Sequence, residues 1–326
     1  MSRRRVWIIG LAGVLLAGAA LALFLWQRST PSAVALLRIL PSQADLYGWV
    51  DVESLQSNPA VRRFLADPPG FSVEEDYKRF IEASGFRYQD DLRQLALAKL
   101  GSNWVGAARV TLDQPRILAY LANEATKKTE GTGRIEEQGQ AVFVFGQVRP
   151  FRLALPENNL AFFTIGEDAS LIGQALRRHA GEAADSGAAE LLREADWQRL
   201  SQGNAVWLVG RMDRLLAPDG SAPEAGPFRL SGPLLRGSKA LYVTVKSRLT
   251  RLEFEVENRC EDAAAAARIA RTLQSLLVLL RAAPGEESNP TQGKLNVLLQ
   301  DISVQQVDDS VHMQWQWDAE TLRNLQ

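Results

Sequence analysis

The sequence predicts an α+β protein in which an N-terminal transmembrane helix precedes two ferredoxin-like (β-α-β-β-α-β) halves with antiparallel sheets. Three observations support this fold class. Residues Val6–Trp26 form an apolar segment without a charge. Apolar and charged residues alternate along Arg251–Glu257, a pattern typical of a strand with one buried and one wet face. Strands and helices are also expected in the same order in residues 44–181 and 203–326.

The segment Val6–Trp26 is expected to cross a bilayer. As a helix with a rise of about 1.5 Å per residue, its 21 residues span about 31 Å, close to the thickness of a hydrocarbon core. Trp7 and Trp26 lie at its ends, where interfacial aromatic residues are common. Small residues at Ala20–Ala22 leave a cleaved signal peptide as the alternative, but Leu23–Trp26 stay apolar beyond them, which favours a retained anchor.

Basic residues predict the orientation of this anchor. Three arginines precede it directly: Arg3, Arg4 and Arg5. Only Arg28 follows it closely, so the positive-inside rule predicts a cytoplasmic N-terminus and an exported body at 29–326. The expected location is the bacterial inner membrane, with a single pass and with the body outside the cytoplasm.

The expected organisation has six parts. They are a cytoplasmic tail (1–5), the transmembrane anchor (6–26), a linker (27–43), a first α+β half (44–181), a connecting helix (182–202) and a second α+β half (203–326). Stretches rich in Gly, Pro, Ser or charge predict mobile, solvated loops at Lys127–Gln140, Ala217–Pro227 and Ala283–Gly293.

The first half is expected to begin with a strand at Asp45–Val52 and a helix that Asn58 caps, with Pro59 at its first position. The later elements are separated by turn residues and follow the apolar pattern. They are strands at Leu95–Leu100, Val105–Leu112 and Val142–Phe145, a helix after Asp113, a hairpin of Phe151–Leu155 with Leu160–Ile165, and a helix at Asp168–Arg178.

The second half repeats this order. Val206–Leu215 aligns with Leu46–Leu55 at an offset of 160 residues. The elements that follow are strands at Ala240–Lys246, Arg251–Glu257 and Leu295–Leu299, a helix at Glu261–Ala282, a hairpin of Ile302–Val307 with Ser310–Trp317, and a helix at Asp318–Asn324.

Few residues in the chain are suited to catalysis or metal binding. There is one cysteine, Cys260, and the two histidines, His179 and His312, lie far apart in the sequence. This set supplies no zinc cluster, and no nucleophile elbow, calcium loop or phosphate loop accompanies it. A Ser-His-Asp triad that uses either histidine stays open, but structural roles are favoured. The sequence therefore predicts a non-enzymatic protein without catalytic residues, metal ligands or cofactors.

Charge and tryptophan content bear on possible partners. Four of the 37 basic residues and none of the 38 acidic residues precede Ser29, so the exported part carries 33 basic and 38 acidic residues, a net charge of −5. This charge argues against a nucleic-acid surface. Trp315 and Trp317 share one face of a strand, where they form either a contact surface for a glycan or peptide or a pair buried beneath a helix, with burial favoured.

Leu40–Val52, with Leu55 and Ser57–Pro59, resembles the opening of a group of uncharacterised bacterial envelope proteins. The resemblance implies a short cytoplasmic tail, one anchor and an exported α+β body, here with an internal duplication, and it implies no activity. The expected function is membrane-anchored binding or scaffolding in the bacterial envelope, with the bilayer and an unidentified envelope protein as partners. The alternatives are a module that binds a lipid or another apolar ligand between the two halves, and an enzyme with an unfamiliar site.

Overall fold

The computed structural model describes most of the chain after residue 30. The described residues are 31–66, 75–126, 131–183, 187–188, 200, 203–215, 235–282, 299 and 301–324. The expected anchor, with Arg3, Arg4, Arg5, Trp7 and Trp26, lies outside them. Most of the expected connecting helix at 182–202 also lies outside them, and the expected loops at 217–227 and 283–293 lie outside them completely.

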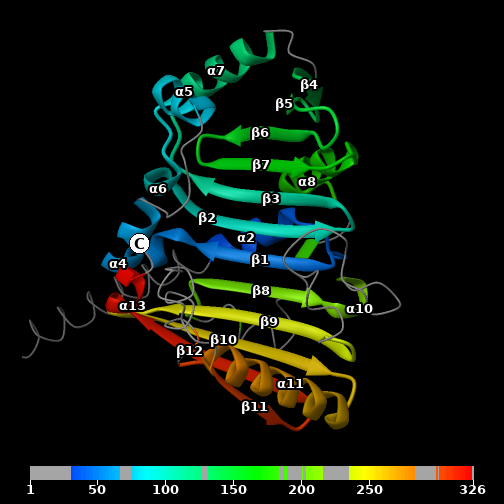
Figure 1. Ribbon diagram of the computed structural model, residues 1–326. Coiled ribbons are helices and arrows are strands. Elements are labelled where there is room, and N and C mark those ends of the chain that lie inside the picture. Colours follow the sequence, from blue (N-terminus) through cyan, green and yellow to red (C-terminus); the bar gives the residue numbers. More distant parts are fainter. Residues whose placement is uncertain are drawn as a thin grey trace, which may run out of the picture.

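One continuous antiparallel sheet of 12 strands forms the body, in the order β11-β12-β10-β9-β8-β1-β2-β3-β7-β6-β5-β4 (Figure 1). The strands of the first half are β1 (Leu46–Asp51), β2 (Leu92–Leu100), β3 (Asn103–Val110), β4 (Gly133–Glu137), β5 (Gln140–Phe145), β6 (Phe151–Glu157) and β7 (Leu160–Ile165). Those of the second half are β8 (Val206–Arg211), β9 (Ser238–Ser247), β10 (Arg251–Cys260), β11 (Ser303–Val307) and β12 (Ser310–Asp318).

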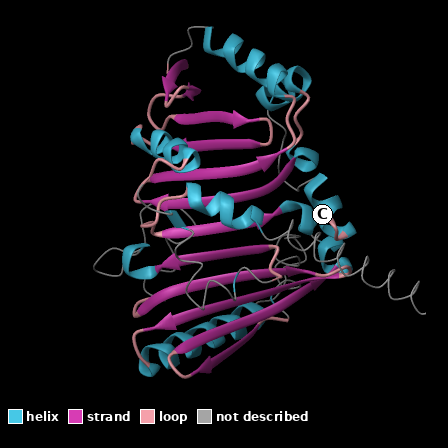
Figure 2. Cartoon of the chain, turned by 180° about the vertical axis from the view of Figure 1, so that it is seen from behind, coloured by secondary structure: helices cyan, strands magenta, loops and turns pink. Residues whose placement is uncertain are grey.

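Helices pack on both faces of this sheet. They are α2 (Pro31–Ile39), α3 (Val52–Gln56), α4 (Pro59–Ala66), α5 (Glu75–Ser84), α6 (Tyr88–Asp91), α7 (Gln114–Thr126), α8 (Ser170–Ala180), α10 (Met212–Leu215), α11 (Ala263–Ala282) and α13 (Ala319–Asn324). One face, called the α2 face below, is covered in the first half by α2 and α8 (Figure 2). The opposite face, called the α11 face, is covered by α7 in the first half and by α11 in the second (Figure 1).

The two halves join where β1 pairs with β8. Trp49 lies opposite Trp207, and both indoles are buried in the same core. The backbone hydrogen bonds at the two ends of this pair are reciprocal. The Asp51 N–H donates to the Ala205 carbonyl at 2.7 Å, and the Arg211 N–H donates to the Asp45 carbonyl at 2.8 Å. Because each donor and each acceptor differs from its counterpart by 160 residues, the contact has local two-fold symmetry, and it supports the offset read from the sequence.

The α+β class and the antiparallel sheet are confirmed, but the structure does not have the ferredoxin-like strand order. In that plan, the helical crossover makes the second strand parallel to the first, and the third strand lies between them, antiparallel to both. Here β1, β2 and β3 instead follow one another as neighbours, all antiparallel, and β8, β9 and β10 do the same. The order of elements along the chain is compatible with either connection, because a helix between two strands does not fix which strands become neighbours.

Two expected loops contain regular structure. The linker predicted at 27–43 includes α2, whose Leu36 and Leu37 are fully buried against the sheet, as is Leu40 directly after the helix. The loop predicted at 127–140 includes β4, the edge strand that pairs with β5. Its polar, charged sequence resembles a solvated loop because charges suit an exposed edge.

Among the described residues, one helix is long and apolar enough to cross a membrane, and it is α11. Its inner face, with Ala266, Ile269 and Ala270, packs with Cys260 and Val311 in a core cluster on the sheet. In this structure α11 is therefore a sheet-packed helix, and its length and composition alone do not make it a span.

Gly106 provides a test of the sheet register. A Cβ on Gly106 would lie 2.1 Å from the ring of Phe163, its cross-strand partner on β7. We expect Gly106→Ala to lower the free energy of unfolding by about 1–3 kcal/mol, because the ring must move in a packed sheet. Denaturation followed by tryptophan fluorescence measures this change. Gly133→Ala is the matched control, since its Cβ meets nothing within 4 Å. Equal stability of the two variants would contradict the register.

Candidate functional site

The α2 face of the second half carries rows of polar side chains. Side chains alternate along β9, β10 and β12, so every second residue of each strand faces the same way. Three cross-strand rows result: Lys246–Glu253–Gln316, Thr244–Glu255–Gln314 and Tyr242–Glu257–His312. Of these, Glu257 is buried, while Gln314 and Gln316 are exposed.

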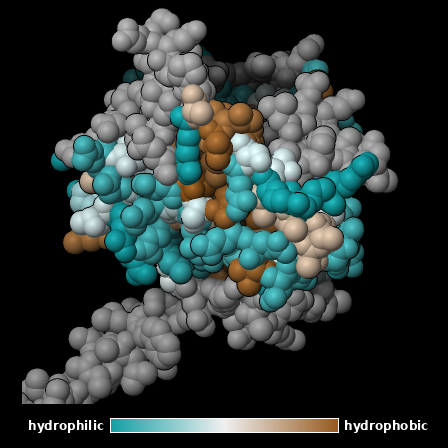
Figure 3. Space-filling view, turned by 60° about the horizontal axis from the view of Figure 1, so that its bottom comes forward, coloured by the Kyte–Doolittle hydropathy of each residue, from teal (hydrophilic) through white to brown (hydrophobic). Residues whose placement is uncertain are grey.

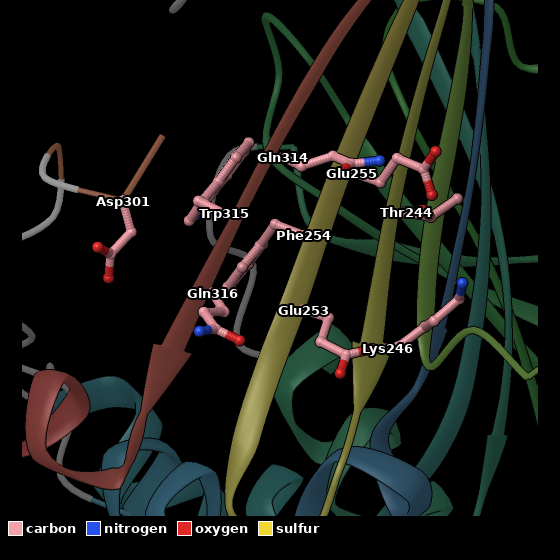
Figure 4. A pocket seen from close by; sticks show the side chains of 9 residues that line it. All are labelled: Thr244, Lys246, Glu253, Phe254, Glu255, Asp301, Gln314, Trp315 and Gln316. Carbon is pink, nitrogen blue, oxygen red and sulfur yellow. The ribbon is translucent and has the colours of Figure 1, made fainter. Parts of the chain in front are cut away.

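A recess of about 480 Å³ lies at these rows and is called the β9–β12 recess below. Figure 4 shows its side chains arising from the three neighbouring strands, with Asp301 beyond β12. The lining residues are Thr244, Lys246, Glu253, Phe254, Glu255, Asp301, Gln314, Trp315 and Gln316. Two smaller cavities adjoin the recess. One, of about 220 Å³, shares Thr244, Lys246 and Glu255 with it, and the other, of about 250 Å³, shares Gln314. The polar surface therefore extends across the sheet from β9 to β11.

The equivalent surface of the first half is a closed hydrophobic core. The strand registers match Thr244–Glu255–Gln314 to Ala98–Val105–Thr164, and Tyr242–Glu257–His312 to Ala96–Ala107–Phe162. All six residues of the first half are at most 1% exposed, and five of the six lie in the core cluster under α2 and α8. The second half thus carries polar residues at positions that the first half uses for packing.

Two arginines neutralise one carboxylate of the recess. Arg251 Nη2 lies 2.7 Å from Glu253 Oε1, and Arg248 Nε lies 3.3 Å from Glu253 Oε2. The hydrogen bond from Arg251, assisted by Arg248, holds the pKa of Glu253 below its usual value. Glu253 therefore stays ionised, and its two arginine partners hold its carboxylate in place at the side of the recess.

A second pair closes the other end of the polar rows. The buried Glu257 carboxylate accepts a hydrogen bond of 2.7 Å from Arg259 Nε, whose guanidinium lies 4.8 Å from the Tyr242 ring centre. Within the described residues, Lys246 and Glu255 form no ion pair; Glu255 lies between the two neutralised carboxylates along β10, and Lys246 lies opposite Glu253 on β9. Since Asp301 also lines it, the recess offers one cation, two further carboxylates and several amide and hydroxyl groups, a combination suited to a polar ligand.

Both tryptophans of the expected contact surface lie at half-buried positions beside the recess. The Trp315 ring stacks on Phe254 with centroids 5.0 Å apart, and the Trp317 ring centroid lies 4.4 Å from that of Phe254. Trp317 also packs against the cluster formed by Val61, Val245 and Leu252. The indole N–H groups of both tryptophans are buried and find no acceptor in the described part of the chain. Because side chains alternate along β10 and β12, the Trp315 and Phe254 rings lie on the α11 face, behind the polar rows, and Trp317 packs beneath α4 on that same face.

The residues with catalytic potential do not converge. His179 Nε2 lies 3.1 Å from Glu157 Oε1 at the end of α8, far along the sheet from the second-half recess. His312 lies beside Glu257 in the polar rows, and the nearby Ser303 hydroxyl donates to the Gln314 carbonyl at 3.2 Å. The described residues contain no group of three His, Cys, Asp or Glu side chains that could hold a metal ion.

Sequence reasoning found only part of this site. The alternation along β10 predicted one wet face carrying Glu253, Glu255 and Glu257; the structure places all three on one face, with Glu253 and Glu255 half-buried and Glu257 buried. Sequence reasoning missed Lys246 and the glutamines of β12, although Gln314 and Gln316 alternate with Trp315 and Trp317. That alternation was the available signal, and only the strand order brings the three strands together.

No protein-family model and no curated protein matches this sequence. The fold is similar to a solved structure, crystal form III of TP0453, with a TM-score of 0.50 and 12% identity over 89% of this chain and 96% of that one. Crystal form IV of TP0453 gives a TM-score of 0.47 with 10% identity, over 88% of this chain and 94% of that one. At this level of identity the first match supports the fold and does not transfer an activity.

The single thiol is expected to be inert in the folded protein. Cys260 is 1% exposed, and burial, with Asp309 nearby, raises the pKa of its thiol. A raised pKa leaves less thiolate at a given pH, so we expect slow reaction with a maleimide at pH 7–8 in native conditions and fast reaction in urea. A cysteine introduced at the exposed Val148 is the control. Equally fast native labelling at both positions would contradict the burial of Cys260.

Proposed function

We propose that the protein is a non-enzymatic binding or scaffolding protein of the bacterial envelope, held in the inner membrane by Val6–Trp26 with residues 29–326 outside the cytoplasm. Its ligand or partner contacts the polar rows of β9, β10 and β12 and enters the β9–β12 recess. The fold similarity is compatible with this proposal, and the basic flank of the apolar segment supports its orientation.

One observation carries the binding role. A sheet face that serves as core in the first half is polar in the second, at structurally equivalent positions. Val105 in the first half contributes to a packed core, whereas Glu255 at the equivalent position of the second half adds nothing to packing and carries a charge that must be solvated. A role in contacting a polar molecule accounts for the difference, because mixed donors and acceptors on a rigid sheet favour such a ligand.

The lining of the described cavities distinguishes this proposal from its alternatives. The recess is lined chiefly by charged and amide side chains, which does not favour a lipid or another apolar ligand. On the α2 face, the junction of the halves at Trp49 and Trp207 is filled by core side chains. An enzyme would need a nucleophile and a base in contact, and the described residues do not bring such a pair together.

Reporter fusions test the topology. We expect alkaline phosphatase fused after Gln326 to be active in bacterial cells, and green fluorescent protein at the same site to be dark, because the body lies outside the cytoplasm. Arg3, Arg4 and Arg5 changed together to glutamate should weaken this bias. A fluorescent and phosphatase-inactive pair in the unaltered chain would refute the proposed location.

Site-specific photocrosslinking tests the binding surface. A photoreactive residue in place of Gln316 is expected to capture a reproducible species in cells, and Glu255→Lys is expected to reduce that capture because it reverses a charge in the recess. A photoreactive residue in place of Val148, which is 82% exposed and far from the recess, is the matched control. The same species captured at both positions, or none at Gln316, would count against this surface.

A further inference from the structure

The last two turns of α11 expose large apolar side chains. Val278 is 64% exposed, Leu279 is 68% exposed and Leu276 is 40% exposed, while Leu277 between them is buried. Apolar surface is visible as a strip, bordered by polar side chains, on the side of the molecule that carries α11 and β11 (Figure 3). Single exposed leucines are ordinary on a protein surface, but Leu276 and Leu279 are three residues apart and adjacent on the helix surface, and Val278, about 100° from Leu279 around the axis, extends the exposed apolar surface along the outer side.

The charges on the outer side of α11 are positive. Arg268 and Arg271 are exposed and precede Val278 by ten and seven residues, which places them on the same side of the helix. The helix contains no acidic residue, and Glu261 and Asp262 lie beyond its N-terminal end, away from the apolar turns. This positive helix stands out in an exported part whose net charge is −5. Arginines beside an exposed apolar stripe are typical of helices that lie in the interface of an anionic bilayer.

The proposed anchor would keep the body close to such a surface. Only four residues separate Trp26, at the end of the apolar segment, from Pro31, where α2 begins. Even when fully extended, four residues span about 14 Å, so α2 starts near the membrane interface. This short connection raises the local concentration of lipid around the body, and a weak second contact then suffices for docking.

We propose that the outer side of α11 docks onto the anionic bilayer that holds the anchor, with Leu276, Val278 and Leu279 entering the interface and Arg268 and Arg271 contacting lipid phosphates. This inference rests on the proposed membrane anchoring. It gives the body two attachments to one membrane, and it fixes the direction in which the sheet and the β9–β12 recess point.

Lipid quenching of a fluorophore on α11 tests the docking. The full chain with Leu279→Cys carries an environment-sensitive dye in vesicles of phosphatidylcholine and phosphatidylglycerol, and the buried Cys260 stays unlabelled. We expect a blue-shifted emission that lipids with a spin label near the headgroup quench several-fold more strongly than the same dye at Val148→Cys. Arg271→Gln in the Leu279→Cys chain should reduce the docked fraction by about fivefold. Vesicles without phosphatidylglycerol should reduce it by a larger factor.

The outcomes separate docking from anchoring. A chain that does not float with the vesicles refutes the anchor, whereas a chain that floats without quenching at residue 279 refutes the docking alone. A blue-shifted dye that lipid does not quench would show that protein, such as a second copy of the chain, covers α11, and it would also overturn the proposal. Val278→Ser in the Leu279→Cys chain should reduce quenching while leaving the unfolding midpoint unchanged, because Val278 is exposed.

Discussion

The antiparallel pairing of β1 with β8 is the contact on which the architecture depends. Each is the first strand of its half, and each would otherwise present an open edge with unpaired backbone groups. Their pairing turns two edges into the centre of one sheet, with Trp49 and Trp207 packed opposite each other. Residues far apart in the chain therefore share one hydrogen-bonded ladder and one core, and the positions of α2, of the polar rows and of α11 are all fixed relative to this line.

A sheet built in this way has two faces in each half, and they are used unequally. The first half has packed helices on both of its faces, with α2 and α8 on one and α7 on the other. In the second half, α11 covers part of one face, and the other carries charged and amide side chains on β9, β10 and β12. The short helix α13, which follows β12 as α8 follows β7, packs against α4. The second half thus devotes less of its sheet to burial.

The sequence predicted elements better than their connections. The strands of the second half, β8 to β10 and β12, lie close to the expected positions because apolar alternation and turn residues are local signals. The helix α2 was missed because its short sequence begins at Pro31, right after the polar residues 27–30, which together resemble a linker. The strand order was wrong because a helix between two strands does not fix which strands become neighbours, and no local pattern encodes the pairing within each half or that of β1 with β8. The recess was missed in part for the same reason, since Lys246 and Gln316 become neighbours of Glu253 only in the folded sheet.

The equivalence of the two sets of rows has an evolutionary consequence. Ala98, Val105 and Thr164 are constrained by packing, so most substitutions there reduce stability and are removed by selection. Their counterparts Thr244, Glu255 and Gln314 contribute little to core packing, so substitutions there cost little stability. Among related sequences, the core rows of the first half should therefore diverge slowly and the polar rows of the second half quickly. The first half is thus the part of the sheet that preserves the fold, and the polar rows of the second half are the part whose surface can change.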